Sequence, residues 1–312
     1  MWLSNPAASP ALLPTAASLG GLLLASLGAL AAVERGRLGQ SVLLRRWAIW
    51  ALITPLYVVG VLSGPLVAWL FVSLLSIQAL REYAALVGLP PRYGRVLLAC
   101  APLAGLAALA GPAAQAALPP LLLIAATLPP LLRGDARDGG RHLARAVFGW
   151  AYLPWLLSYL LLIQRDVRGG PEVLLALGLA VALADVGAYC AGKRLGGRKL
   201  APAISPRKTW GGMAGALLGA ALGLGLGAAS SAPTLAPPVA LGAASSAPTL
   251  AGLAIVVAGG AVWGDLLESL LKREAGVKDA GAWLPGFGGL LDRLDSLVLV
   301  LPLSYYYLRW VA

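Results

Sequence analysis

The sequence predicts an all-α, polytopic integral membrane protein with about ten transmembrane helices. Three observations predict this fold class. The 312 residues are 59% hydrophobic and only 12% charged, whereas about 25% of the residues in a soluble domain are charged. The mean hydropathy is +0.81. Apolar runs of 16–23 residues recur along the whole chain, so we expect neither a single soluble core nor a simple cleaved leader.

The apolar runs and the turns between them define the expected spans in chain order. Each run approaches the ~20 residues that a helix needs to cross the hydrocarbon core of a bilayer. We expect residues 1–146 to form an N-terminal transmembrane scaffold and residues 147–312 to form a C-terminal transmembrane region that carries the chemistry. The expected spans are approximately 11–33, 47–62, 65–80, 95–111, 116–132, 147–163, 172–191, 211–228, 251–271 and 290–310.

The basic residues test this span count, because alternate connecting segments are basic. The five basic segments carry four, three, four, six and four Lys or Arg, which is 21 of the 24 in the chain. The positive-inside rule therefore predicts that both termini lie outside and that these five segments face the cytoplasm. The net charge of +11 is then explained by cytoplasmic loops that contact anionic membrane lipid, and no nucleic-acid partner is expected.

A few polar residues of the apolar spans and loops carry weaker signals. Cys100 and Cys190 lie in separate apolar runs without CxxC spacing, so we interpret them as small core residues and not as a disulfide or a zinc site. The single histidine, His142, lies between Arg141 and Arg145 and is interpreted as a solvated loop residue, so neither a Ser-His-Asp triad nor a multi-histidine metal site is expected. Glu82 follows Arg81 where the third span ends; we favour a local ion pair over a ligand contact.

The first segment that could carry chemistry is residues 184–212, ADVGAYCAGKRLGGRKLAPAISPRKTWGG. Asp185 lies near the end of an apolar helix, where an unpaired carboxylate is costly. Several cations and a Gly-Gly turn follow, and Ser205 and Thr209 are suitable residues for the start of a helix at about Trp210. Cations and free backbone N–H groups at a helix start suit a polyphosphate; a basic loop that touches lipid headgroups is the alternative.

The second segment, Trp263 to Ser296, holds six of the thirteen acidic residues of the chain. Asp265, Glu268, Ser269 and Lys272 have i, i+3, i+4, i+7 spacing, so they share one face of a helix. Downstream, two aspartates three residues apart open the tenth span, after glycine pairs that permit a tight turn. They are Asp292 and Asp295.

The chemistry of this second segment has two interpretations. Oxygen ligands without His or Cys indicate a hard cation such as Mg²⁺. The alternative is an interfacial salt-bridge network between the acidic residues and Lys272, Arg273 and Arg293. Both segments are expected on the cytoplasmic side. Carboxylates beside cationic, glycine-rich turns are typical of phosphoryl or nucleotidyl transfer at a membrane surface.

The residues quoted above resemble a known family. The stretch from Ser269 to Ser296, SLLKREAGVKDAGAWLPGFGGLLDRLDS, is similar to the signature of phosphatidate cytidylyltransferases, also called CDP-diacylglycerol synthases, at every signature position except one. The upstream segment resembles the same family through Asp185, Ala188-Tyr189, Gly192-Lys193 and the run from Ser205 to Thr209. The resemblance covers roughly the last 130 residues in the expected order.

The resemblance implies transfer of a cytidylyl group from CTP to phosphatidate, giving CDP-diacylglycerol and pyrophosphate. It implies Mg²⁺ or another divalent cation, with a second cation as an option, held by Asp265, Asp292 and Asp295. Together with Lys272 these are the expected catalytic residues. The expected substrate-binding residues are Asp185, Tyr189, Lys193, Ser205, Arg207, Lys208, Thr209, Arg273, Lys278 and Arg293. The family also suggests a bacterial inner membrane, a site facing the cytoplasm, and compatibility with a homodimer.

Two positions depart from the family pattern and keep other hypotheses open. Phe287 stands where the signature has His, and Gly211 stands where the family usually has Glu. Phe cannot donate a hydrogen bond or relay a proton, so a non-catalytic or substrate-shifted relative that binds lipid or nucleotide is the second hypothesis. A transporter that uses the buried carboxylates is the third. It predicts charges near the bilayer midplane, whereas here the charges cluster at one membrane face.

Overall fold

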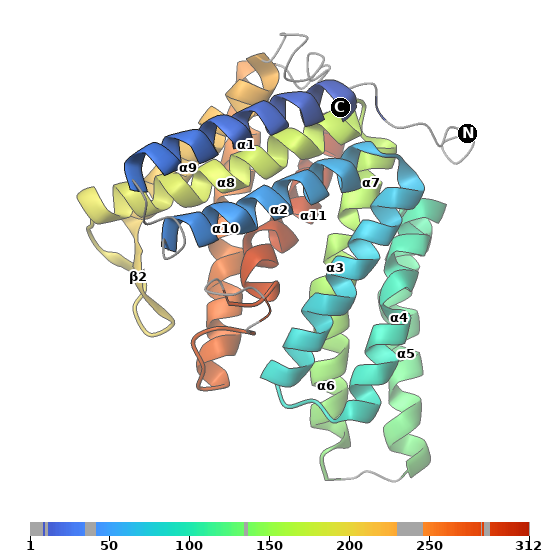
Figure 1. The fold of residues 1–312 in the computed structure, drawn as a ribbon. Helices are drawn as coiled ribbons and strands as arrows, with labels where there is room; N and C mark the ends of the chain where they lie inside the picture. Colours follow the sequence, from blue (N-terminus) through green and yellow to red (C-terminus); the bar gives the residue numbers. More distant parts are fainter. Residues whose placement is uncertain are drawn as a thin grey trace.

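The protein is an assembly of long helices with one short β-hairpin (Figure 1). The computed structural model describes residues 9, 12–34, 42–133, 137–229, 246–281, 283 and 288–311. The helical elements coincide with all ten expected spans. They are α1 (Leu12–Glu34), α2 (Val42–Leu62), α3 (Pro65–Leu86), α4 (Pro91–Ala110), α5 (Pro112–Arg133), the rod of α6 (Gly139–Trp150), η2 (Ala151–Trp155) and α7 (Tyr159–Asp166), then α8 (Gly170–Arg194), α9 (Trp210–Ala229), α10 (Ala247–Glu274) and α11 (Leu291–Val311).

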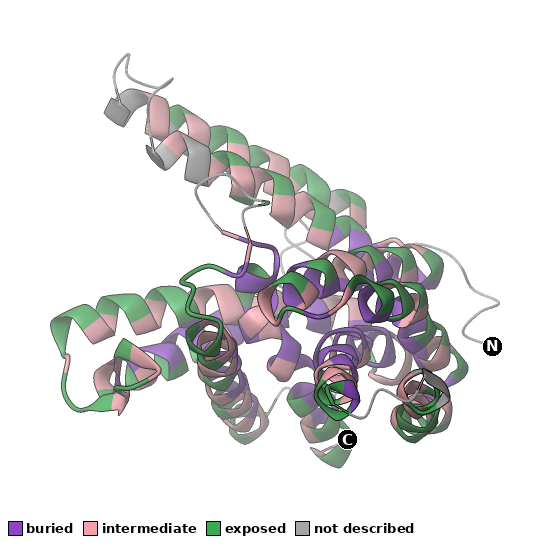
Figure 2. Cartoon of the chain, turned by 90° about the horizontal axis from the view of Figure 1, so that it is seen from below, coloured by how far each residue is buried: buried purple, intermediate pink, exposed green. Residues whose placement is uncertain are grey.

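The lengths and compositions of the helices confirm a polytopic membrane protein. Among the described residues, six helical segments are long and apolar enough to cross a membrane: α3, α4, the α6–α7 rod, α8, α9 and α10. Shorter apolar stretches lie in α1, α2 and α5. The outward faces carry large apolar side chains, such as Leu218, which is 73% exposed. Such faces suit contact with lipid, and the buried residues line the inner faces where helices meet (Figure 2).

Several of the basic segments expected in the cytoplasm lie toward one end of the molecule, but the adjoining ends of α1 and α2 lie at the left of Figure 1, away from that end. The connection between α3 and α4, the adjoining ends of α5 and α6, and the C-terminal end of α10 all lie at the lower end of Figure 1. The hairpin strand β2 projects downward from the α8–α9 pair in the same view. The elements at the lower end therefore border basic segments of the sequence, and their position in the cytoplasm stays a prediction.

Glycines set the close packing of α8 against α9. Gly215, Gly219 and Gly223 recur every four residues on α9, so they form one stripe that faces α8. A Cβ atom on Gly215 would collide with the carbonyl oxygen of Gly187, and one on Gly219 would collide with the carbonyl oxygen of Leu183. Small residues let helix backbones approach in this way in membranes, where there is no hydrophobic drive between helices.

A two-stranded hairpin joins α8 to α9 and is the one sheet among the described residues. The strands β1 (Lys199–Ala201) and β2 (Ser205–Thr209) are antiparallel. Thr209 starts α9 as expected, because the Gly212 N–H donates to its Oγ1 at 3.1 Å. The expectation that Ser205 starts a helix is wrong. Ser205 lies in β2, paired with Ala201, since the run SPRKT continues the hairpin up to the helix.

The α6–α7 rod contains a π-helical turn that the sequence analysis did not predict. Residues Ala151–Trp155 form this turn, which includes Pro154. Proline lacks an N–H donor, and an inserted residue locally rotates the side chains that follow it. Tyr152 lies within this turn and is buried in the interior, with 3% of its surface exposed.

Candidate active site

The charged face expected on α10 forms as the spacing predicts. Ser269 Oγ donates to Asp265 Oδ1 at 3.2 Å, and Lys272 Nζ donates to Glu268 Oε2. Each pair is four residues apart, so the helix itself brings the two members together. The same ammonium also donates to Asp292 Oδ1 on α11 at 2.8 Å. Lys272 therefore joins the end of α10 to the start of α11.

Asp292 is fixed by backbone donors as well as by this lysine. Its Oδ2 accepts from the Gly289 N–H at 2.7 Å and from the Ala280 N–H at 3.1 Å. Asp292 is in the first turn of α11, where the helix dipole favours a negative charge. The Asp292 carboxylate therefore holds the segment that connects α10 to α11 through the amides of Ala280 and Gly289.

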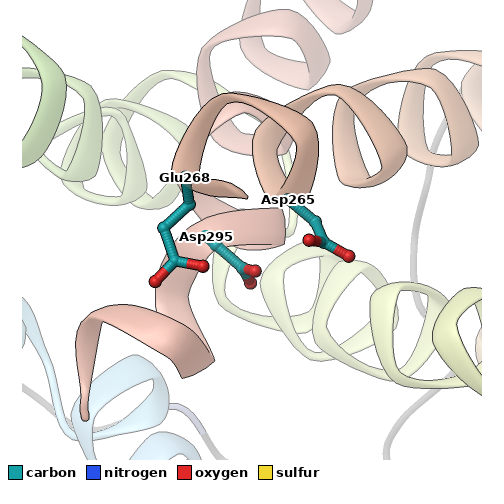
Figure 3. Close-up of side chains that lie close together, drawn as sticks. All are labelled: Asp265, Glu268 and Asp295. Atoms are coloured by element: carbon teal, nitrogen blue, oxygen red, sulfur yellow. The ribbon is translucent and has the colours of Figure 1, made fainter. Parts of the chain in front are cut away.

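Three other carboxylates meet between α10 and α11. Asp265, Glu268 and Asp295 each offer an oxygen, and these oxygens lie within 4.8 Å of one another. Figure 3 shows the three side chains directed into one space, two from α10 and one from α11. Like charges at this separation repel strongly in a medium of low dielectric constant. The cluster is therefore stable only with protons or cations to balance it.

The donor set fits a divalent cation. All three side chains are oxygen donors, which hard cations such as Mg²⁺ prefer. Glu268 is 0% exposed, and its Oε1 has no hydrogen-bond partner among the described residues. A buried, unsatisfied carboxylate oxygen is costly, so a ligand to fill that place would be stabilising. Asp265, Glu268 and Asp295 are the residues that could hold the ion.

The predicted metal set differs from this cluster by one member. Asp265 and Asp295 are brought together as the resemblance implies, with Glu268 as the third carboxylate. Asp292 faces Lys272 instead. The salt-bridge network that is the alternative for this segment is observed in part, since Lys272 pairs with Glu268 and Asp292. The assignment of Asp265, Asp292 and Asp295 as metal ligands stays a prediction.

The hairpin brings the second predicted segment to the carboxylates. Lys208 Nζ lies 2.7 Å from Asp265 Oδ2 and donates to the Val262 carbonyl at 3.0 Å. Arg273, at the end of α10, donates through Nε to the Ile204 carbonyl at 3.3 Å. Two contacts therefore hold β2 and its preceding turn against α10. Segments that are about 60 residues apart in the sequence share one site.

Asp185, Arg293 and Tyr152 complete the surroundings of the cluster. Asp185 is near enough to Asp265, Lys208 and Arg293 to interact electrostatically with each. The buried Tyr152 interacts in the same way with the three clustered carboxylates. Its hydroxyl has no hydrogen-bond partner among the described residues. A phenol placed beside carboxylates can donate to one of them or to a ligand that they hold.

Among the described residues, the structure does not bring the remaining predicted substrate-binding residues into contact with the cluster. Tyr189 is 70% exposed on the outer side of α8. Four basic residues are also exposed: Lys193, Arg207, Lys278 and Arg273, of which Arg273 alone has the hairpin contact given above. Ser205 and Thr209 serve the hairpin and the α9 start. Their predicted roles toward substrate stay predictions.

Of the two positions that depart from the family pattern, Gly211 and Phe287, the structure describes only Gly211. Gly211 packs against the Gly-Gly turn, because its N–H donates to the Gly196 carbonyl at 3.2 Å. A Cβ at position 211 would lie 2.7 Å from that same oxygen, so this backbone arrangement requires glycine. Phe287 lies outside the described residues.

Glu82 is the main residue whose role the sequence analysis missed. The expected ion pair with Arg81 is wrong: among the described residues the Glu82 carboxylate accepts from the N–H groups of Leu290 and Leu291 and from Gln78. An acidic residue inside an apolar span was a usable signal. Nothing local indicated its partners, which lie more than 200 residues further along the chain. Tyr152 gave no signal of this kind, because buried tyrosines are common.

The chain is similar to known proteins over most of its length. A family model described as "Cytidylyltransferase family" matches residues 44–311. A protein of Escherichia coli K12 described as "Uncharacterized protein YnbB" is 34% identical over 299 residues, which cover 88% of this chain and 89% of that protein.

Shorter matches join the chain to enzymes of stated activity. A phosphatidate cytidylyltransferase of Pseudomonas aeruginosa is 45% identical over 161 residues, and one of Haemophilus influenzae is 40% identical over 143 residues. These matches span about half of each enzyme, 55% and 48% respectively. The family model covers most of the chain and includes every residue of the site. The chain is therefore a member of the cytidylyltransferase family, a family of nucleotidyltransferase enzymes.

Proposed function

We propose that the protein transfers a cytidylyl group from CTP to phosphatidate, with CDP-diacylglycerol and pyrophosphate as products. The family membership and the stated activity of the half-length relatives support this substrate pair. The observation that carries the proposal is the meeting of three carboxylates with Lys208 and Lys272 at the junction of α10, α11 and the hairpin. Nucleotidyl transfer needs this combination of a cation-binding centre and fixed positive charge.

The reaction is a displacement at phosphorus. A phosphate oxygen of phosphatidate attacks the α-phosphorus of CTP, and the bond from that phosphorus to the oxygen bridging to the β-phosphate breaks. Pyrophosphate leaves with the electron pair, so no covalent enzyme intermediate is required. A divalent cation held by the carboxylates would neutralise charge on the triphosphate.

The side chains of the protein supply fixed charge and orientation. Lys208 and Lys272 are held by carboxylates, so their ammonium groups are in place before substrate arrives. Arg273, Lys278 and Arg293 are the further candidates for contact with phosphate oxygens. Of the predicted metal ligands, Asp265 and Asp295 belong to the cluster, and we assign Asp292 to holding Lys272 and the start of α11.

We also propose that the site lies at the cytoplasmic face of a bacterial inner membrane. Cytoplasmic CTP would reach it through the basic loops, and phosphatidate would reach it from the bilayer. The positive-inside distribution of Lys and Arg supports this orientation.

The test is a transfer assay on the purified protein in detergent or vesicles. Labelled CTP, Mg²⁺ and phosphatidate are supplied, and liponucleotide and pyrophosphate are measured together. We expect equal amounts of both products, loss of product with EDTA, and recovery with excess Mg²⁺. Asp265→Asn should reduce kcat by at least about 100-fold, in the range seen for loss of a transition-state contact.

A matched control keeps this assay interpretable. Asp138→Asn changes an exposed aspartate that pairs with Arg141 at the surface, and it should retain parent activity. A folded parent protein that releases no pyrophosphate, and that behaves the same with Asp265→Asn, would contradict the proposal. Release of pyrophosphate only when another lipid phosphate replaces phosphatidate would show a shifted substrate.

Phe287 stands where the family signature has histidine, and this departure favours a second candidate function, which is binding of nucleotide or lipid without transfer. The variant Phe287→His separates the two functions. If the parent binds CTP without transfer and this variant gains transfer activity, the non-catalytic function is correct. Transfer by the parent itself excludes it.

A further inference from the structure

The start of α11 is held from a distant part of the chain by Glu82 on α3. The Glu82 carboxylate accepts from the Leu290 N–H at 3.0 Å through Oε1 and from the Leu291 N–H at 2.8 Å through Oε2. Glu82 is only 7% exposed. Gln78, one turn earlier on α3, donates to Oε1 at 2.9 Å and fixes the orientation of the carboxylate.

The backbone around this carboxylate leaves no space for side chains. A Cβ atom on Gly281 would lie 3.0 Å from Glu82 Cδ, and one on Gly289 would collide with Glu82 Oε2. Both glycines belong to the segment that joins α10 to α11. Glycine at these two positions therefore lets the backbone approach Glu82 closely without moving its side chain.

Glu82 and Asp292 accept hydrogen bonds from different backbone N–H groups at and before the start of α11. Glu82 takes the N–H groups of Leu290 and Leu291, and Asp292 takes those of Gly289 and Ala280. The first N–H groups of a helix have no partners within the helix, and the helix dipole stabilises negative charge there. This environment explains how a carboxylate can be buried without an ion pair to Arg81.

We propose that Glu82 is a positioning residue for the transfer reaction: it fixes the first turn of α11, so that Asp292 meets Lys272 and Asp295 meets Asp265 and Glu268. This inference rests on the proposed function. Asp292 lies one residue after Leu291, and Asp295 lies one helical turn further on. A shift of the first turn would therefore move both carboxylates together, and a misplacement of about 1 Å can lower a rate about 100-fold.

The test substitutions keep the size of the side chain. Glu82→Gln retains one carbonyl acceptor but turns an NH₂ group toward a backbone N–H. We expect kcat to fall about 10-fold to 100-fold, with the KM for CTP changed less than about threefold, because the reacting geometry is altered more than the binding of the nucleotide. Glu172→Gln is the matched control, since Glu172 bonds to Ser9 away from the site, and it should retain the parent kinetics.

A second readout does not depend on activity. Hydrogen exchange at the Leu290 and Leu291 amides should be about tenfold faster in Glu82→Gln than in the parent, with exchange in the core of α8 unchanged. Parent-like exchange at these two amides together with parent-like kcat would overturn the inference. Faster exchange with an unchanged kcat would also overturn it, since the anchor would then be structural only.

Failure of the proposed function gives a different pattern. In that case the parent makes no liponucleotide, and the exchange experiment alone reports whether Glu82 holds α11. Should Glu82→Gln fail to fold, Gln78→Leu is the milder variant, because it keeps the carboxylate and its bonds to the Leu290 and Leu291 amides and removes only the side-chain donor to Oε1. A two- to fivefold fall in kcat with faster exchange would support the inference, and parent values for both would overturn it.

Discussion

Lys208 and Arg207 are neighbours in the chain, but the structure pairs only Lys208 with a carboxylate. Successive side chains of a strand point to opposite faces, so β2 directs Lys208 toward Asp265 and leaves Arg207 exposed. The family resemblance implies a substrate-binding role for both residues and does not distinguish between them. At the scale of single residues, the hairpin register thus decides which cation belongs to the site.

The first residue-scale prediction concerns this lysine. Lys208→Met should lower kcat/KM by about 100-fold, because a fixed positive charge next to the carboxylate cluster is lost. Lys199→Met, an exposed lysine on β1, is the control and should stay within about threefold of the parent. Steady-state kinetics with varied CTP measures both. Equal effects of the two substitutions would show that only the total charge of the hairpin matters.

The second residue-scale prediction compares two buried tyrosines. The Tyr83 hydroxyl donates to the Arg145 carbonyl at 2.9 Å, whereas the Tyr152 hydroxyl has no partner among the described residues. Tyr83→Phe should therefore lower the unfolding free energy by about 1 kcal/mol. Tyr152→Phe should leave stability nearly unchanged and lower transfer activity about tenfold.

Thermal unfolding and the transfer assay separate these two effects. A clear loss of stability in Tyr152→Phe would show that its hydroxyl bonds within the protein and is unavailable to a ligand. The comparison is matched, because each substitution removes one oxygen atom from a buried ring.

At the scale of elements, the glycine stripe of α9 sets the position of the hairpin. Gly215, Gly219 and Gly223 bring the α9 backbone against α8, and β1 and β2 join the ends of these two helices. The separation of α8 and α9 therefore fixes where Lys208 can reach. The sequence alone predicted both helices but not their close approach, because glycines in an apolar run are also compatible with loose packing.

The element-scale prediction is a substitution in this stripe. Gly219→Leu should lower the unfolding free energy by about 1–3 kcal/mol through overpacking, and transfer activity should fall with it. Gly225→Leu is the control, since a Cβ there meets nothing within 4 Å. Thermal stability in a fixed detergent measures both. Equal tolerance of leucine at the two positions would contradict tight α8–α9 packing.

At the scale of the whole molecule, the site joins parts from both halves of the chain. The division into residues 1–146 and 147–312 stays a prediction, and the Glu82 contacts cross it. The expected scaffold therefore supplies an anchor for the site. The homodimer also stays a prediction.

The whole-molecule prediction concerns orientation in the membrane. With Cys100 and Cys190 replaced by alanine, Lys199→Cys and Lys278→Cys should both react with an impermeant thiol reagent from the cytoplasmic side only. Arg168→Cys, between α7 and α8, should react from the opposite side. Labelling in intact cells and in inverted vesicles tests this. Labelling of positions 199 and 278 from different sides would exclude a shared cytoplasmic site.

The sequence by itself determined the spans, the alternation of basic loops and the charged face of α10. Each of these is periodic or local: hydrophobic length defines a span, and i, i+4 spacing brings Lys272 to Glu268 in any helix. The family signature likewise lies within one continuous stretch. These features need no knowledge of how the helices pack.

Only the tertiary structure decided which of these groups meet. It placed Glu268 with Asp265 and Asp295, paired Asp292 with Lys272, and brought Glu82 to amides 208 and 209 residues away. It also turned Lys208 inward, through a hairpin, and placed Tyr152 within a π-helical turn. The physical reason is that such contacts depend on the packing and rotation of whole helices, which the local pattern of residues does not specify.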